Sequence, residues 1–224
     1  MNSLHDSRRK KIEKFIVLNA RTKQIQLIKF SEIIQSNFMP ALLAMVKDGV
    51  RKSLEFLRGE FDTEEEFESY VQSNINSDLE IYPKSLWYSL FTQSYFFFEN
   101  DLNELCKKLQ QLKECNISLS DFNGKGISRA RKYLTKVMEV DFASVETEWN
   151  KVTILQKIRN IISHRAGNLN NSNHEQVIRD YFKDRDEEMI DENGYILINQ
   201  PIVVDAADTF REFWLGMNLE LFYD

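Results

Sequence analysis

Residues 144–167, SVETEWNKVTILQKIRNIISHRAG, contain the pattern that decides the fold. Ser144 is a good N-cap, Glu146 and Glu148 place negative charge in a first helical turn, and Gly167 suits a left-handed C-cap. Between these ends apolar residues recur at helical spacing: Val145, Trp149, Val152, Leu155, Ile158 and Ile162. The stretch therefore predicts an amphipathic helix over residues 144–166 that packs against other helices.

The same periodicity occurs in segments on both sides of this helix. The first 80 residues predict amphipathic helix interrupted at Pro40 and at Gly59. The acids that follow Asp62 favour the start of a short helix ending near Ser73, and Pro83 suits the first turn of a long helix that reaches residue 114. Further helices are expected over residues 127–139, after Asn173, and from about Asp205.

One segment predicts strands instead. Asn193-Gly194 lies between Met189-Ile190 and residues 195–198, a pattern typical of a two-residue β-hairpin. We therefore expect an all-α helical bundle with a small β-hairpin before the C-terminal helix. Residues 1–80 would form an N-terminal helical extension and residues 81–224 the main helical domain, the two making one continuous globular unit.

Length and composition exclude several classes of protein. The 224 residues are 42% hydrophobic and 29% charged, and they include only 7 Gly, 3 Pro and 2 Cys, which suits neither a β-sandwich nor a disulfide scaffold. No stretch approaches the ~20 apolar residues of a membrane helix, and the apolar run over residues 15–18 is too short for a signal peptide. We therefore expect a cytoplasmic protein that does not bind membranes.

The net charge of −6 is distributed in alternating blocks. The formal charge is +6 over residues 1–60, −9 over 61–104, +6 over 105–183 and −9 over 184–224. A cationic block can attract a polyanion even when the whole chain is acidic, because the local field matters more than net charge. Solvated helix faces explain most such blocks without any partner.

Most catalytic signatures are absent from the sequence. There is no Gly-x-Ser-x-Gly elbow, His-Glu-x-x-His pair or Walker sequence, and the three histidines, His5, His164 and His174, form no metal-binding cluster. We therefore predict neither a metal site nor a cofactor.

His164 is distinguished by its neighbours. With Arg159, Asn160 and Ser163, it interrupts the apolar pattern near the end of the helix predicted over residues 144–166. Asn160 and His164 share a helical face. An imidazole titrates near neutrality and can transfer protons, while a guanidinium binds phosphate through two parallel hydrogen bonds. This combination favours phosphodiester chemistry.

The segment from Arg159 to His164 resembles the Arg-x4–6-His motif of the HEPN superfamily (higher eukaryotes and prokaryotes nucleotide-binding), in which Asn often follows the Arg. The flanking order is similar too: Phe98-Glu99-Asn100-Asp101-Leu102, then Gly124-x-Gly126-Ile127-x-Arg129-Ala130, then Trp149. The resemblance covers roughly residues 83–224. It implies a helical bundle and a metal-independent endoribonuclease in which two units form one composite site. Many members act in toxin–antitoxin or phage-defence systems.

The resemblance implies a role for each motif residue. His164 would be the general base, Arg159 would stabilise charge on the phosphoryl oxygens, and Asn160 would orient Arg159 or bind phosphate. Cleavage would leave a 2′,3′-cyclic phosphate and a 5′-hydroxyl. The RNA backbone would contact a set of nearby basic residues: Lys125, Arg129, Lys132, Lys136 and Arg165. The implied partners are RNA, a second copy of the chain in a homodimer, and a cognate antitoxin protein.

Two other interpretations of the sequence stay open. The chain could be a non-catalytic HEPN module that binds RNA, a nucleotide or a protein partner. It could also be a structural helical protein that forms a complex through its acidic segment, residues 61–104. In that case His164 and Arg165 would only favour the negative end of a helix dipole.

Overall fold

The computed structural model describes residues 2–185 and 188–217, with side chains from residue 16 onward. The prediction of an all-α fold is confirmed. The seven α-helices found in the described part are α1 (Asn2–Ile33), α2 (Met39–Leu54), α3 (Glu64–Leu112), α4 (Gly126–Lys136), α5 (Glu146–Arg165), α6 (Glu175–Phe182) and α7 (Gln200–Gly216). Short π or 3-10 turns, η1 (Ile34–Phe38), η2 (Glu55–Glu60), η3 (Leu119–Asp121) and η4 (Ala143–Val145), connect some of them.

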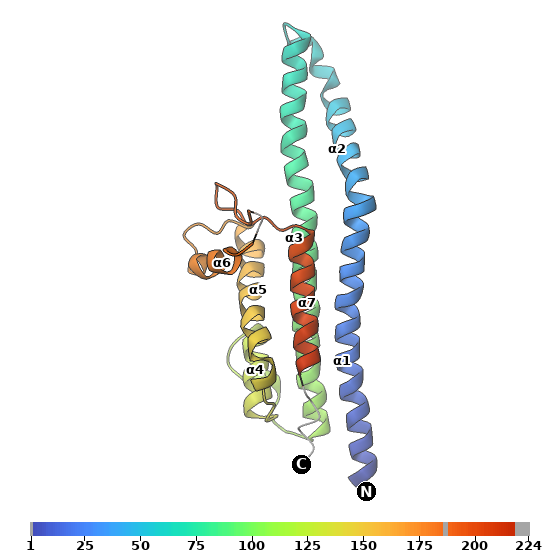
Figure 1. Ribbon diagram of the computed structural model, residues 1–224, viewed down its shortest axis with the longest axis vertical. Helices are drawn as coiled ribbons and strands as arrows, with labels where there is room; N and C mark the ends of the chain where they lie inside the picture. Colours follow the sequence, from blue (N-terminus) through green and yellow to red (C-terminus); the bar gives the residue numbers. More distant parts are fainter. Residues whose placement is uncertain (1, 186–187, 218–224) are drawn as a thin grey trace.

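Helices α1 and α2 run along one side of the molecule, the chain reverses at η2, and α3 returns over the whole length (Figure 1). In the lower half, α7 lies against α1, α3 and α5, and α5 also contacts α3 and α6. In the upper half, α2 and the first part of α3 extend beyond the other helices as a two-helix arm. The motif helix α5 is thus fixed within the lower bundle.

The prediction of two separate helices around Pro83 is wrong, because α3 continues through this residue. A proline inside a helix removes one backbone hydrogen bond and costs about 3 kcal/mol. Packing on both sides of the proline offsets this cost. Upstream, Phe67, Val71 and Ile75 form the small core of the arm, and downstream Trp87 enters the main core.

The two predicted interruptions in the first 80 residues differ in extent. Pro40 lies in the first turn of α2, where it needs no N–H, and the π-helical turn η1 precedes it, so that the chain stays helical. Gly59 lies in η2, where the chain reverses.

The N-terminal extension contributes to the main core through α1. Ala20, Leu27 and Ile34 are buried in the same cluster as the apolar residues of the other body helices. Gln24 of α1 donates to the Ser94 carbonyl oxygen at 3.2 Å and accepts from the Ser94 hydroxyl at 2.9 Å, which fixes the register of α1 on α3. The predicted boundary at residue 80 falls inside α3.

The predicted β-hairpin is not confirmed. Residues 189–197 form a turn at Asn193-Gly194 with isolated antiparallel bridges, Ile190 with Ile196 and Asn168 with Tyr195, and the described part of the chain contains no strand. The second bridge pairs this segment with the loop after α5 rather than extending a hairpin. Helix α7 then begins at Gln200, five residues before the predicted start, because the Asn199 side chain caps it by accepting from the Ile202 N–H.

The C-terminal end of α5 lies very close to α3. Ala166 caps the helix in the left-handed conformation with φ of 50°, and Gly167 follows with φ of 87°. A Cβ on Gly167 would lie only 2.0 Å from the Tyr88 Oη, and that hydroxyl donates to the Ile196 carbonyl oxygen at 2.6 Å. Gly167 therefore allows α3, the end of α5 and the turn over residues 189–197 to meet.

We predict that Gly167→Ala lowers the free energy of unfolding by about 2–4 kcal/mol, because it adds left-handed strain and displaces Tyr88. The matched control is Gly49→Ala in exposed α2, where a Cβ meets nothing within 4 Å. That change should raise stability by about 0.5–1 kcal/mol. Urea unfolding of both variants measures the difference, and equal stabilities would contradict the packing described for Gly167.

Candidate functional site

Arg159 and Asn160 interact directly on the second-last turn of α5. The Arg159 Nη1 donates to the Asn160 Oδ1 at 3.0 Å. Because adjacent helical residues point about 100° apart, this bond turns the guanidinium toward the Asn160 side of the helix. His164 projects from that same side, one turn later.

Helix α3 restrains the guanidinium from a second direction. The Arg159 Nη2 lies 3.8 Å from the Glu99 Oε2, and the Arg159 Cζ lies 5.2 Å from the centre of the Tyr95 ring. Burial, together with the Glu99 charge, raises the pKa of the Tyr95 hydroxyl, so that this ring stays neutral beneath the cation. Arg159 is thus held in place while its side chain keeps 29% exposure.

The start of α4 closes the other side of Glu99. A Cβ on Gly126 would lie 2.9 Å from the Glu99 Oε1 and 3.3 Å from the Gln156 Nε2. Gly126 also has φ of 58°, in the left-handed region that glycine adopts readily. The Gly124-x-Gly126 segment therefore brings α4 against the carboxylate that restrains Arg159.

His164 is solvent-exposed in the last turn of α5. Among residues 16–185 and 188–217, its side chain has no hydrogen-bond or ion-pair partner. Arg159, Asn160 and His164 therefore occupy one end of one helix, as predicted, but no direct contact joins the imidazole to the other two. The structure leaves His164 free to meet an incoming molecule.

The predicted RNA-binding residues differ in their surroundings. Arg129, Lys132 and Lys136 recur every three or four positions along α4, so they share one face, whereas Lys125 is the extended residue that precedes the helix. The three lysines are exposed, whereas Arg129 is half-buried. Arg165 has a structural bond, since its Nη2 donates to the Asn170 carbonyl oxygen at 2.7 Å.

A surface groove of about 470 Å³ borders Arg159. It lies between α3 and α5 and is lined by Tyr88, Ser89, Thr92, Gln93, Phe96, Arg159 and Ile162. The restrained guanidinium therefore stands at the edge of a hollow that a ligand could enter.

The described part of the chain carries neither a metal-binding cluster nor a membrane-spanning helix. Its residues include no group of three or more His, Cys, Asp or Glu side chains placed to hold a metal ion. None of its helices combines the length and the hydropathy needed to cross a membrane.

The chain matches no protein-family model, no curated protein and no solved structure. The resemblance to the HEPN superfamily rests on the residues named above, and the activity that it implies stays a prediction.

Sequence reasoning did not identify Tyr95, Glu99 and Gln156 as parts of this site. The one available signal was the spacing of Tyr95 and Glu99, which places a carboxylate one turn after an aromatic ring. Nothing in the sequence shows that α5 packs on this face of α3, so the partner of Glu99 could not be predicted.

We predict that Arg159→Ala and Glu99→Gln are not additive in stability. The pair is partly exposed, with 29% and 22% of the side chains accessible, so solvent screening limits its coupling energy to about 0.5–1 kcal/mol. Urea unfolding of the wild type, both single variants and the double variant measures it. Glu99→Gln combined with Arg165→Ala is the control and should be additive, because Arg165 bonds to Asn170 instead. If the changes in free energy of unfolding caused by Arg159→Ala and Glu99→Gln simply add, Glu99 is not part of the site.

Proposed function

We propose that the protein is a HEPN-type endoribonuclease that cleaves RNA without a metal ion. The observation that carries this proposal is the placement of Arg159, which Asn160 and Glu99 hold beside a groove, on the helix end that also exposes His164. A preoriented guanidinium suits a phosphodiester, and an exposed imidazole suits proton transfer at neutral pH.

The chemistry follows from these two groups. His164 takes the proton of a ribose 2′-hydroxyl, and the 2′-oxygen attacks the adjacent phosphorus. The bond from phosphorus to the 5′-oxygen breaks, and a second imidazole gives that oxygen a proton. Arg159 stabilises the negative charge on the non-bridging oxygens, which is commonly the largest electrostatic contribution. The products are a 2′,3′-cyclic phosphate and a 5′-hydroxyl, and DNA resists because it lacks the nucleophile.

The second imidazole is best supplied by another copy of the chain. His174 precedes α6 and lies ten residues beyond His164, outside the motif, and the side chain of His5 lies outside the described residues. His164 itself is exposed, so a symmetric partner can approach it. In the composite site, one His164 acts as base and His164 of the partner subunit acts as acid.

We predict that the active protein is a homodimer. Light scattering at micromolar concentration should give about twice the mass of one chain, because cleavage needs both imidazoles. A strict monomer with unimpaired cleavage would contradict the composite site.

We predict that His164→Ala lowers the rate of RNA cleavage by about 10²–10⁴-fold, toward the upper end because both imidazoles are lost together. Arg159→Ala should be similarly damaging, and Arg159→Lys should restore activity only in part because it keeps the charge but loses the two-pronged geometry. Cleavage of a generic RNA in EDTA measures all three.

The control for this experiment is His174→Ala, which removes an imidazole outside the motif and should leave the rate unchanged. Melting temperatures of the same preparations separate loss of chemistry from loss of fold. If a folded His164→Ala variant cleaves RNA at the wild-type rate, His164 is not the general base. Tight RNA binding without cleavage by the wild type would instead indicate the non-catalytic HEPN module.

The same resemblance suggests a toxin or phage-defence effector that acts on cytoplasmic RNA and has a cognate antitoxin. If expression of the wild type is toxic to cells, His164→Ala should relieve the toxicity.

A further inference from the structure

The groove beside Arg159 carries an exposed aromatic ring and free hydrogen-bonding groups. Phe96 of α3 keeps 53% of its surface exposed although it lies on a helix packed within the bundle. Gln93 and Thr92, one turn earlier, also line the groove, and within the described residues their side chains make no hydrogen bond. The Ser89 hydroxyl donates to the Ser85 carbonyl oxygen at 2.8 Å and keeps its acceptor capacity.

One cation lines this groove, and a second lies one helical turn beyond its other end. Helix α5 runs antiparallel to α3, because Arg159 meets Glu99 while Gly167, farther along α5, meets Tyr88 earlier on α3. Arg159 therefore marks one end. One helical turn before Tyr88, the Lys84 Nζ lies 5.6 Å from the centre of the Tyr88 ring and 4.1 Å from the centre of the Tyr195 ring, and no acidic partner of Lys84 occurs among the described residues.

We propose that this groove binds one unpaired nucleobase of single-stranded RNA, next to the phosphate that Arg159 contacts. The base stacks on Phe96, its edge bonds to Gln93 and Thr92, and Lys84 attracts the neighbouring phosphate. The volume of about 470 Å³ lies within the range typical of small-molecule sites. The inference rests on the proposed function for the identity of the ligand, and it predicts a preference for single strands, whose bases are free to stack.

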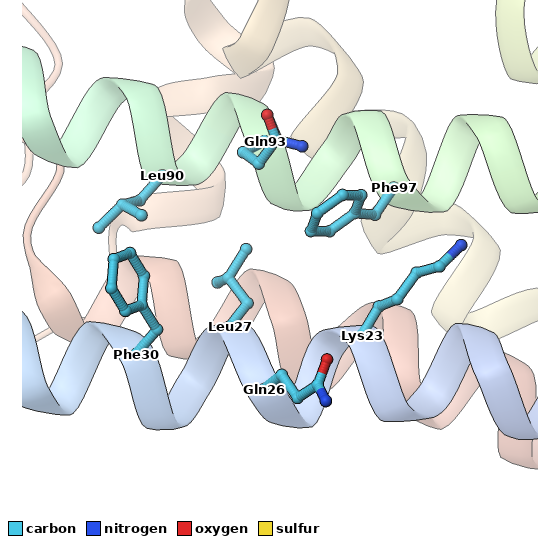
Figure 2. Close-up of a pocket in the computed structure, with 7 residues that line it drawn as sticks. All are labelled: Lys23, Gln26, Leu27, Phe30, Leu90, Gln93 and Phe97. Carbon is cyan, nitrogen blue, oxygen red and sulfur yellow. The ribbon is translucent and has the colours of Figure 1, made fainter.

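A second groove, shown in Figure 2, can be compared with the groove beside Arg159. It lies between α1 and α3, has a volume of about 310 Å³, and also borders Gln93. Its aromatic residue Phe30 is 53% exposed, as Phe96 is. Its one cation, Lys23, forms an ion pair with the buried Asp101 that is closer than the 3.8 Å between the Arg159 Nη2 and the Glu99 Oε2, so Lys23 is less available to a phosphate. Phe30 is therefore a matched control for Phe96.

The test measures binding of wild-type protein to a fluorescent 2′-O-methyl RNA strand, which the proposed reaction cannot cleave. Phe96→Ala should weaken binding roughly 5- to 100-fold, the usual effect of losing one base–aromatic stack. Phe96→Trp keeps a stacking surface and should bind nearly as well as the wild type. Phe30→Ala should bind as the wild type does.

A strand with one abasic position identifies the group that Phe96 contacts. The abasic position is moved along the strand one nucleotide at a time. When it replaces the base that occupies the groove, the wild type should bind the strand about as weakly as Phe96→Ala binds the intact strand. Phe96→Ala should bind this abasic strand no more weakly still. A duplex of the same sequence should bind independently of Phe96, because its bases are paired. Unchanged affinity of a folded Phe96→Ala variant for the intact strand would overturn the inference.

The outcomes for the groove and for the nuclease are distinguishable. If cleavage is absent but binding depends on Phe96 and on one base, the base site stands and the nuclease proposal fails. If cleavage depends on His164 but binding is insensitive to Phe96, the nuclease proposal stands and the base site fails. If the protein binds no RNA strand at all, the base site is overturned directly.

Discussion

The candidate site depends on the close antiparallel approach of α5 to α3. Gly167 makes this approach possible, because any Cβ there would collide with the Tyr88 hydroxyl, which is bonded to the Ile196 carbonyl oxygen. That contact fastens the end of α5 and the following turn to the same place on α3. Two to three helical turns away, the same pairing sets Arg159 against Glu99 and Tyr95. The groove between the two helices and the position of the guanidinium are consequences of one packing arrangement.

The two motif residues with chemical roles are restrained very differently. Asn160, Glu99 and Tyr95 limit the motion of Arg159, which reduces the entropy lost when it binds a phosphate. His164 has no such support in the described structure, so under the proposed mechanism its imidazole would be oriented by RNA or by a second copy of the chain. A site assembled in this way is incomplete in the single chain, which fits a reaction that needs two imidazoles on opposite sides of one phosphate.

Local sequence signals predicted α5 well and α3 poorly. The predicted ends of α5 lie within two residues of the observed ones, and its apolar stripe is buried, because periodicity acts within one helix. The prediction that Ser144 is the N-cap is wrong: Val145 occupies that position, and the Ser144 hydroxyl donates to the Gly216 carbonyl oxygen at 2.9 Å. Pro83 was misleading because tertiary packing of Trp87 and the arm core outweighs a lost backbone bond, and the hairpin segment pairs partly with the loop after α5 instead. In the site, the motif could be predicted because its residues share one helix. Glu99, Tyr95 and the groove could not, since they depend on which face of α3 meets α5.

The most direct measurement uses an RNA in which a single 2′-hydroxyl, at a position the enzyme cuts, is replaced by hydrogen. The account predicts that cleavage stops at that position and continues at unmodified positions, and that mass spectrometry of the remaining products shows 2′,3′-cyclic phosphate and 5′-hydroxyl ends. In the proposed mechanism the 2′-oxygen is the nucleophile, and His164 removes its proton. Cleavage that persists at the 2′-deoxy position would show that water or another group attacks the phosphorus, which would contradict the proposed role of His164.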